Sequence, residues 1–161
     1  TYVRAKTMEA IEATHKKVDT ALKAGGDAVG AQTVIATMPG QLPLACNNRL
    51  NELFVTNAKI AEPNVAVKDA GHFSASTDMG DVSHLLPVIH PFIGGVDGFL
   101  HTADFHVVDF KHAVLLPAKA FAMMIVDLLA DDAELARQIK AEHHPLLTKE
   151  EYIAKLDKYF Q

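Results

Sequence analysis

The chain has 161 residues, of which 49% are hydrophobic and 22% charged, and its formal net charge at pH 7 is −5. This composition is typical of a folded globular protein, and an acidic chain without a Lys/Arg cluster argues against a nucleic-acid-binding surface. The single Cys46 excludes an intrachain disulfide and favours a reducing compartment, so we expect a cytoplasmic protein. No uninterrupted apolar run approaches the ~20 residues that span a bilayer, so we expect no membrane contact.

The first 43 residues predict a strand, a helix and a second strand. Residues 2–5 form the first strand, and Thr7 is placed to cap a helix that Gly25 and Gly26 end. Residues 28–38 alternate loosely and are rich in Val, Ile and Thr, which predicts a strand. A strand–helix–strand unit of this size is half of a small α+β domain.

Residues 44–142 predict further helices and short strands. Asn47 is a good N-cap for a helix that Pro63 ends, and Pro117 fits the first turn of a helix running to about residue 129. That second helix is apolar on nearly every side, so we expect it to be buried, and residues 133–142 continue as an amphipathic helix. Short strands are expected at 65–67 and 107–108, a strand or a loop at 86–93, and a loop at 70–79.

The end of the chain predicts one more helix. The preceding helix is broken by His143, His144 and Pro145, and Thr148 with Glu151 forms a capping box that opens the last helix.

Three short motifs are typical of a site built on loops. They are the turn Ser76-Thr77-Asp78-Met79-Gly80-Asp81, the pair Gly94-Gly95, and the segment Leu100-His101-Thr102-Ala103-Asp104-Phe105. A loop imidazole such as His101 is a common Zn²⁺ ligand, although a histidine bonded to backbone is the commoner arrangement. Asp78 and Asp81 could orient a metal ligand or cap a helix. The glycine pair could admit a substrate or make a turn.

These motifs resemble the carboxy-terminal part of the M20 family of metallo-amidohydrolases. Leu100, His101, Thr102 and Phe105 agree with the family's pattern, whereas Ala103 stands where the family usually has Pro. The turn, with Thr-Asp in place of the general family's Glu-Asp, resembles the aminobenzoyl-glutamate hydrolase branch. The resemblance implies an α/β fold: residues 1–43 as half of an α+β lid or dimerisation domain, then residues 44–161 as the carboxy-terminal half of a mixed-sheet metallohydrolase domain.

The resemblance also implies roles for individual residues. His101 is expected to bind a divalent metal, Zn²⁺ or Mn²⁺, while Asp78 and Asp81 orient a ligand or order the loop. Arg4 and the glycines Gly94 and Gly95 are expected to contact a small N-acyl amino acid or dipeptide-like substrate, although Arg4 could equally be a solvated arginine on an edge strand.

Most of the expected chemistry is absent from this sequence. No catalytic residue is expected in this chain, because the general base and the other metal ligands would lie in an amino-terminal half that precedes residue 1. We therefore expect a homodimeric amidohydrolase of which this chain alone is inactive. Two alternatives are a non-catalytic α/β module that dimerises through residues 2–38 and binds a ligand near the glycine pair, and a homologue that has lost catalysis.

Overall fold

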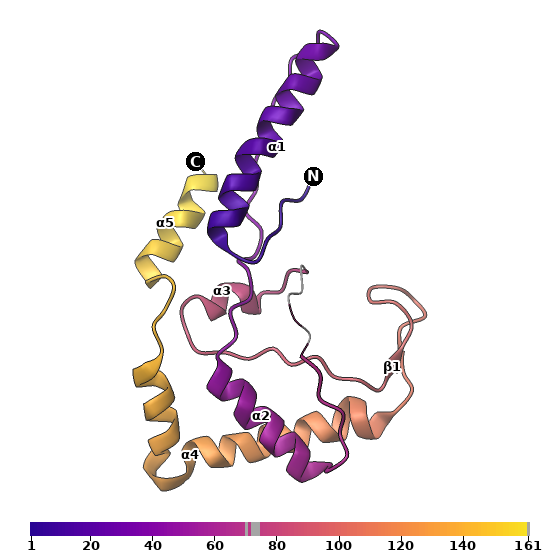
Figure 1. Ribbon diagram of the computed structural model, residues 1–161, viewed down its shortest axis with the longest axis vertical. Coiled ribbons are helices and arrows are strands. Elements are labelled where there is room, and N and C mark those ends of the chain that lie inside the picture. Colours follow the sequence, from indigo (N-terminus) through magenta and orange to yellow (C-terminus); the bar gives the residue numbers. More distant parts are fainter. Residues whose placement is uncertain (70, 72–74, 161) are drawn as a thin grey trace. The chain divides into compact units, whose positions relative to one another are not determined.

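The computed structural model describes residues 1–69, 71 and 75–160 (Figure 1). In chain order its elements are α1 (Met8–Ala28), α2 (Asn48–Ala61), α3 (Met79–Ser83), β1 (Val96–Asp97), β2 (His106–Val107), η1 (Lys111–Leu115), α4 (Leu116–Glu142) and α5 (Lys149–Phe160). The chain divides into two compact units. The first unit comprises residues 1–45, 70–86 and 145–161, and the second comprises residues 46–69 and 87–144.

Helix α1 begins as predicted but ends later. The Thr7 hydroxyl accepts a hydrogen bond from the Ala10 amide at 3.3 Å, which confirms the cap. The helix then continues through Gly25 and Gly26 to Ala28, so the predicted stop is wrong. Two glycines cost helix stability but do not forbid helical backbone. No residue of α1 is buried.

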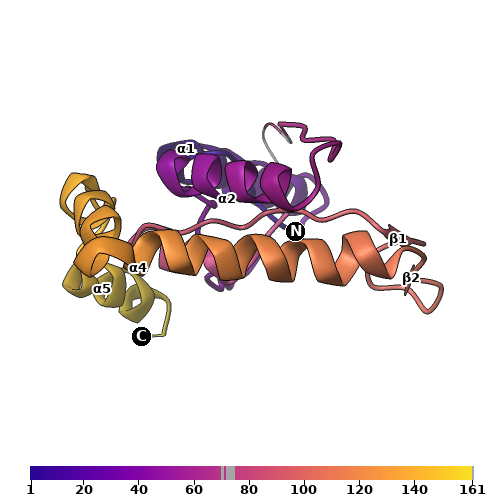
Figure 2. The same ribbon diagram turned by 90° about the horizontal axis from the view of Figure 1, so that it is seen from below.

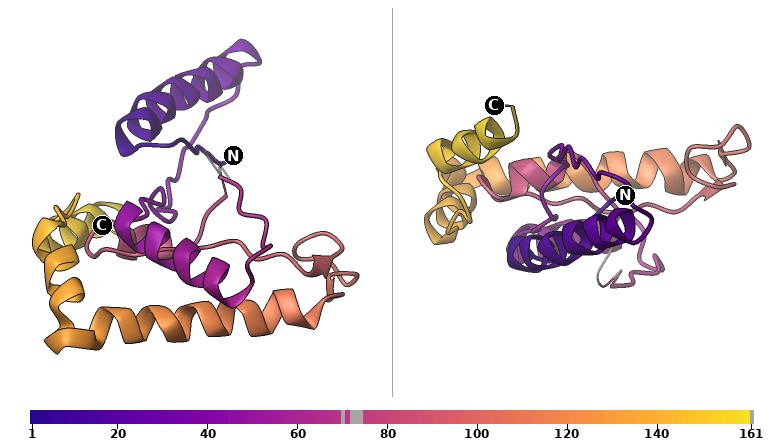
Figure 3. Two further views of the ribbon diagram at one scale, coloured as in Figure 1. Left: turned by 60° about the horizontal axis from the view of Figure 1, so that its bottom comes forward. Right: turned by 90° about the horizontal axis from the view of Figure 1, so that it is seen from above.

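The strands predicted on either side of α1 do not form. Residues 2–5 and 31–40 have no regular secondary structure, and residues 31–40 run back beside the helix (Figure 3). Both predictions of a strand are therefore wrong for this structure, since a strand exists only when a second strand pairs with it.

Helix α5 begins at the predicted capping box. The Glu151 amide donates to the Thr148 hydroxyl at 3.1 Å, and the Thr148 amide donates to the Glu151 carboxylate at 2.7 Å. The two bonds are reciprocal, as the motif requires. Lys155 of the same helix pairs with Glu12 of α1 at 3.3 Å.

The core of the second unit lies where α2 packs against α4 (Figure 2). The Asn47 side chain caps α2 by accepting from the Leu50 amide at 3.0 Å, and the helix ends before Pro63, both as predicted. The ring centroids of Phe54 and Phe121 lie 4.9 Å apart. The buried cluster consists of Leu50, Phe54, Ala58, Ala120, Met124 and Ile139.

Helix α4 is less buried than its sequence predicts. Pro117 stands in its first turn and the helix ends before His143, both as predicted, whereas residues 130–133 leave helical geometry where the sequence predicted that the helix continues from residue 133. However, Ile125, Val126 and Leu129 are 56%, 66% and 63% exposed, so the prediction of a fully buried helix is wrong. The buried residues of α4 face α2 and the half-buried Ile89 and Ile93, and the rest of the helix stays accessible.

The segment 111–142 is long and apolar enough to cross a membrane by length and composition, once a few charged residues are tolerated. The sequence analysis considered only uninterrupted apolar runs, none of which is long enough to span a bilayer. The helical segment 111–142 reaches that length because it includes a few charged residues. Core helices of soluble proteins meet the same criterion, so this feature assigns no location to the protein.

The described residues contain one small sheet. Strands β1 and β2 pair antiparallel, with Val96 opposite Val107 and Asp97 opposite His106. The expected strand at 107–108 is thus confirmed in part, residues 65–67 form none, and residues 86–93 follow the loop alternative. The predicted loop at 70–79 lies partly outside the described residues.

At the coarsest level the chain combines helices with a β-sheet, as an α/β class requires. The finer division into a lid domain, residues 1–43, and a metallohydrolase domain, residues 44–161, stays a prediction.

Candidate functional site

His101 lies in the turn that connects β1 to β2. Its backbone is left-handed, with φ of 65°, which is uncommon for a residue other than glycine. The turn is held by its own bonds: the Thr102 amide donates to the Phe99 carbonyl at 3.2 Å, and the Phe105 amide to the Thr102 carbonyl at 3.3 Å. The Thr102 hydroxyl also bonds the Asp104 carboxylate. The His101 side chain is exposed, and no hydrogen bond to it is present within the described residues.

This hairpin offers one metal donor and not a complete set. In residues 1–69, 71 and 75–160, no group of three His, Cys, Asp or Glu side chains could hold a metal ion. A protein zinc site needs three or four such ligands. The neighbouring His106 ring nitrogen Nδ1 is bonded to the Asp104 carbonyl at 2.6 Å instead. The described residues therefore do not complete the metal site that the resemblance implies.

The geometry at the base of the hairpin requires a glycine at residue 95, the second of the pair. Gly95 has φ of 87°, and its carbonyl accepts from the amides of Val108 and Asp109 at 3.0 Å each. A Cβ at Gly95 would lie 2.6 Å from the Asp109 carbonyl oxygen, whereas a Cβ at Gly94 would meet nothing within 4 Å. The turn thus requires Gly95 for steric reasons. A substrate contact at Gly94 and Gly95 stays a prediction.

The two aspartates of the turn at residues 76–81 bind residues 41 and 42. Gln41 Nε2 donates to Asp78 Oδ1 at 2.8 Å, and the Leu42 amide donates to Asp81 Oδ1 at 3.1 Å. Asp78 stands at the N-terminus of α3, but its side chain makes no capping bond, so the capping alternative does not hold for it. Its carboxylate is directed to residue 41 instead, so the two aspartates order a loop by joining chain segments far apart in sequence.

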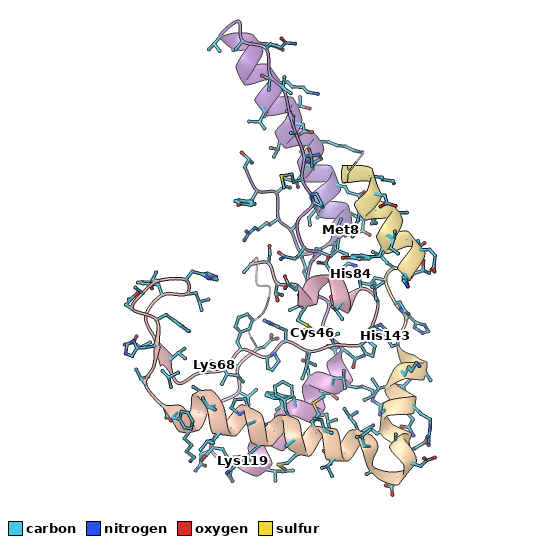
Figure 4. The ribbon with its side chains drawn as sticks, turned by 180° about the vertical axis from the view of Figure 1, so that it is seen from behind. Met8, Cys46, Lys68, His84, Lys119 and His143 are labelled. Atoms are coloured by element: carbon cyan, nitrogen blue, oxygen red, sulfur yellow. The ribbon has the colours of Figure 1, made fainter. Side chains whose placement is uncertain are left out.

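Two further side chains of the same turn bind the same segment. The Ala45 amide donates to the Ser83 hydroxyl at 3.0 Å, and His84 Nε2 is 2.9 Å from the Pro43 carbonyl oxygen. Both side chains are buried, and His84 lies just after α3 (Figure 4). The His84 carbonyl in turn accepts from the Leu147 amide at 3.0 Å. We call Asp78, Asp81, Ser83 and His84 the α3 clamp.

Gly80 allows the backbone of α3 to approach residue 42 closely. A Cβ at this position would lie 1.9 Å from the Leu42 carbonyl oxygen, which is far inside van der Waals contact. The sequence alone indicates neither this role of Gly80 nor the bond made by Ser83. Asp78, Asp81 and His84 stand three residues apart, which is the spacing of one side of a helix, but this spacing does not include Gly80 or Ser83.

Arg4 is not on a strand in this structure. Its guanidinium carbon lies 5.1 Å from the centroid of the Tyr2 ring, in cation–π geometry. Its role in binding a substrate carboxylate stays a prediction. The predicted residues divide between the two units: His101, Gly94 and Gly95 belong to one, and Arg4, Asp78 and Asp81 to the other.

Two charge pairs follow the hairpin where η1 begins. His112 Nδ1 lies 2.6 Å from Asp109 Oδ2, and this hydrogen bond lowers the pKa of Asp109 below its ordinary value. Lys111 pairs with Glu62 after α2, which lowers the pKa of Glu62 and raises that of Lys111. All four groups are solvent-accessible, so the pairs fix the start of η1 more than they stabilise the fold.

Comparison of the chain with protein-family models, with curated proteins and with solved structures finds no match.

Proposed function

We propose that the chain is part of a metal-dependent amidohydrolase that cleaves the amide bond of N-acyl amino acids or aminobenzoyl-glutamate-like substrates. The proposal rests on the motifs that resemble the M20 family, and one structural observation supports it most directly. The His101 imidazole is exposed on a turn held by its own hydrogen bonds, and it has no partner in the described part of the chain. Because the imidazole is exposed and has no partner among the described residues, both of its ring nitrogens are accessible to a metal ion.

In this proposal the chain contributes one metal ligand and an ordered loop. His101 would supply one nitrogen to Zn²⁺ or Mn²⁺, and Asp78 and Asp81 would hold the segment that precedes α2 through the α3 clamp. The remaining ligands and the general base would come from a polypeptide segment not present in this sequence. The described residues alone do not complete the site, so the chain by itself is expected to be inactive.

The decisive experiment uses the longer protein encoded when the reading frame is extended upstream of residue 1. Its metal content and its hydrolysis of N-acyl amino acids would be measured together with the His101→Ala variant. We expect a loss of at least about 100-fold in activity in that variant, because even residues that only orient a metal ligand contribute 10- to 100-fold. His106→Ala is the matched control, since His106 lies in the same hairpin but is bonded to the Asp104 carbonyl.

Two results would contradict the proposal. A longer protein that binds metal and hydrolyses its substrate equally well without the His101 imidazole would remove this residue from the site. A reading frame that begins at residue 1 would instead favour the non-catalytic dimerising module. For the isolated chain, near-stoichiometric metal binding that is lost in His101→Ala would contradict the need for another segment.

A further inference from the structure

The turn at residues 99–102 holds His101 in a conformation that favours glycine. The Thr102 amide donates to the Phe99 carbonyl, so His101 is the third residue of a four-residue turn at the end of the hairpin (Figure 2). Its φ is 65°, and a turn with a positive φ at the third residue favours glycine or asparagine there. Because glycine would satisfy the backbone here at no steric cost, the position is a candidate for a role of the side chain.

The side chain of Thr102 closes this turn more tightly than the backbone does. The Thr102 hydroxyl donates to the Phe99 carbonyl oxygen at 2.6 Å, whereas the Thr102 amide donates to the same oxygen at 3.2 Å. Ordinary N–H···O bonds extend to about 3.2 Å, and O–H···O bonds are about 2.5–3.0 Å long. The amide bond is therefore at the weak end of its range, and the hydroxyl bond is well inside its own. The same hydroxyl also contacts the Asp104 carboxylate.

Packing does not hold His101 in this conformation. Every residue from 99 to 105 is exposed, and the two residues before His101, Phe99 and Leu100, are 80% and 59% exposed. A strained backbone conformation persists only where its surroundings impose it. At the end of this hairpin the hydrogen bonds of the turn have to impose it, and Thr102 makes the two that close it.

We propose that Thr102 is a positioning residue for His101. Its hydroxyl keeps the backbone at residue 101 left-handed and thereby fixes the direction of the imidazole. The inference rests on the proposed function, in which this imidazole binds a divalent metal. Side chains of such a site must be held within about 0.5 Å and 10–20° of their working geometry. A change of φ from 65° to the negative values that L-residues prefer exceeds that tolerance several-fold.

The first measurement is made on the full chain by NMR. A left-handed residue gives a strong NOE between its own amide and α hydrogens, because a positive φ brings these two hydrogens together. We expect this NOE at His101 in the unaltered chain, a weak one in Thr102→Val, which replaces the hydroxyl by a methyl group, and a strong one again in Thr102→Ser. Thr20→Val is the matched control, since the Thr20 hydroxyl also donates to a backbone carbonyl, that of Lys16 at 2.9 Å, but in the other unit.

The second measurement titrates Zn²⁺ into the longer protein that tests the proposed function. Thr102→Val should lower the zinc affinity by about 10- to 100-fold, the range found for residues that orient a metal ligand. Thr102→Ser keeps the hydroxyl and should restore the affinity, and Thr20→Val should leave it unchanged. His101→Ala removes the imidazole itself and should lower the affinity at least as far as Thr102→Val does.

Three results would overturn the inference. A strong NOE at His101 in Thr102→Val would mean that the hydroxyl does not hold the backbone. A zinc affinity that Thr102→Val leaves unchanged, or that Thr102→Ser fails to restore, would mean that the hydroxyl does not position the imidazole; the proposed function still stands in that case if His101→Ala lowers the affinity. An unchanged affinity in His101→Ala would instead remove the proposed function and this inference together.

Discussion

Replacement of Gly80 by alanine should weaken the hydrogen bonds that Asp78 and Asp81 of the α3 clamp accept from residues 41 and 42. The added Cβ would lie 1.9 Å from the Leu42 carbonyl oxygen, so the backbone at residue 42 must move by more than about 1 Å to reach the ~3 Å of a tolerable contact. Such a shift breaks the 3.1 Å bond from the Leu42 amide to Asp81 and strains the 2.8 Å bond from Gln41 to Asp78.

The size of the effect follows from these two bonds. A hydrogen bond to a charged group contributes about 1.5–3 kcal/mol, and both aspartates are accessible enough to regain water. We therefore expect a loss of about 2–4 kcal/mol in the local stability of the clamp, which corresponds to faster exchange of the Leu42 amide hydrogen by roughly 30- to 900-fold. Hydrogen exchange measured residue by residue would detect it.

Gly40→Ala is the matched control, because a Cβ at Gly40 meets nothing within 4 Å. We expect this variant to change the exchange of the Leu42 amide little, or to slow it slightly through a less flexible unfolded chain. Equal exchange of Leu42 in the two variants would refute the close approach of α3 to residue 42 and with it the loop-ordering role of the aspartates.

Three further predictions concern the second unit. Gly95→Ala should destabilise the hairpin by about 2 kcal/mol or more, measured by thermal unfolding, whereas Gly94→Ala should be neutral. Asn57→Ala removes the 2.7 Å hydrogen bond that Asn57 Nδ2 donates to Asp127 Oδ2 on α4, so the amide hydrogens of α2 should exchange about 10-fold faster or more. Unchanged exchange would refute the bond. The His112 hydrogen bond lowers the pKa of Asp109 in the folded state, so this pair stabilises the fold above the ordinary carboxyl range, and its contribution is lost as the pH falls through the lowered pKa. Urea unfolding at decreasing pH should therefore depend less on pH in Asp109→Asn, and an identical dependence would contradict the pairing.

The helices could be predicted from the sequence because their signals are local. Thr7, Asn47 and Thr148 each cap the helix they were expected to cap, and Pro117 stands in the first turn of α4. A cap needs only the next three residues to form its bond. The end of α1 was the exception, since Gly25 and Gly26 weaken a helix without supplying the left-handed residue that would end it; Gly30, with φ of 71°, follows instead.

The candidate site could be predicted only in part, for the opposite reason. The motifs located His101 on a turn and the aspartates in a small-residue loop, but their partners could not be found from spacing. Asp78 and Asp81 bind residues 41 and 42, nearly forty positions earlier in the chain, and no local pattern encodes that pairing. The same limit explains α4: its composition predicts burial, but composition does not say which element covers each face.

The strand predicted at residues 28–38 does not form, although part of its sequence pattern is visible in the structure. The alternation of residues 28–38 and their β-branched composition persist in the structure as a half-buried and exposed period at Thr33, Val34 and Ile35, yet no ladder forms. A helix satisfies its own backbone, whereas a strand depends on a second strand, so alternation and β-branched composition do not by themselves decide whether a strand forms. The exposed Ile125, Val126 and Leu129 of α4 illustrate the same limit, because apolar composition predicts burial but burial needs a second element that covers the side chains.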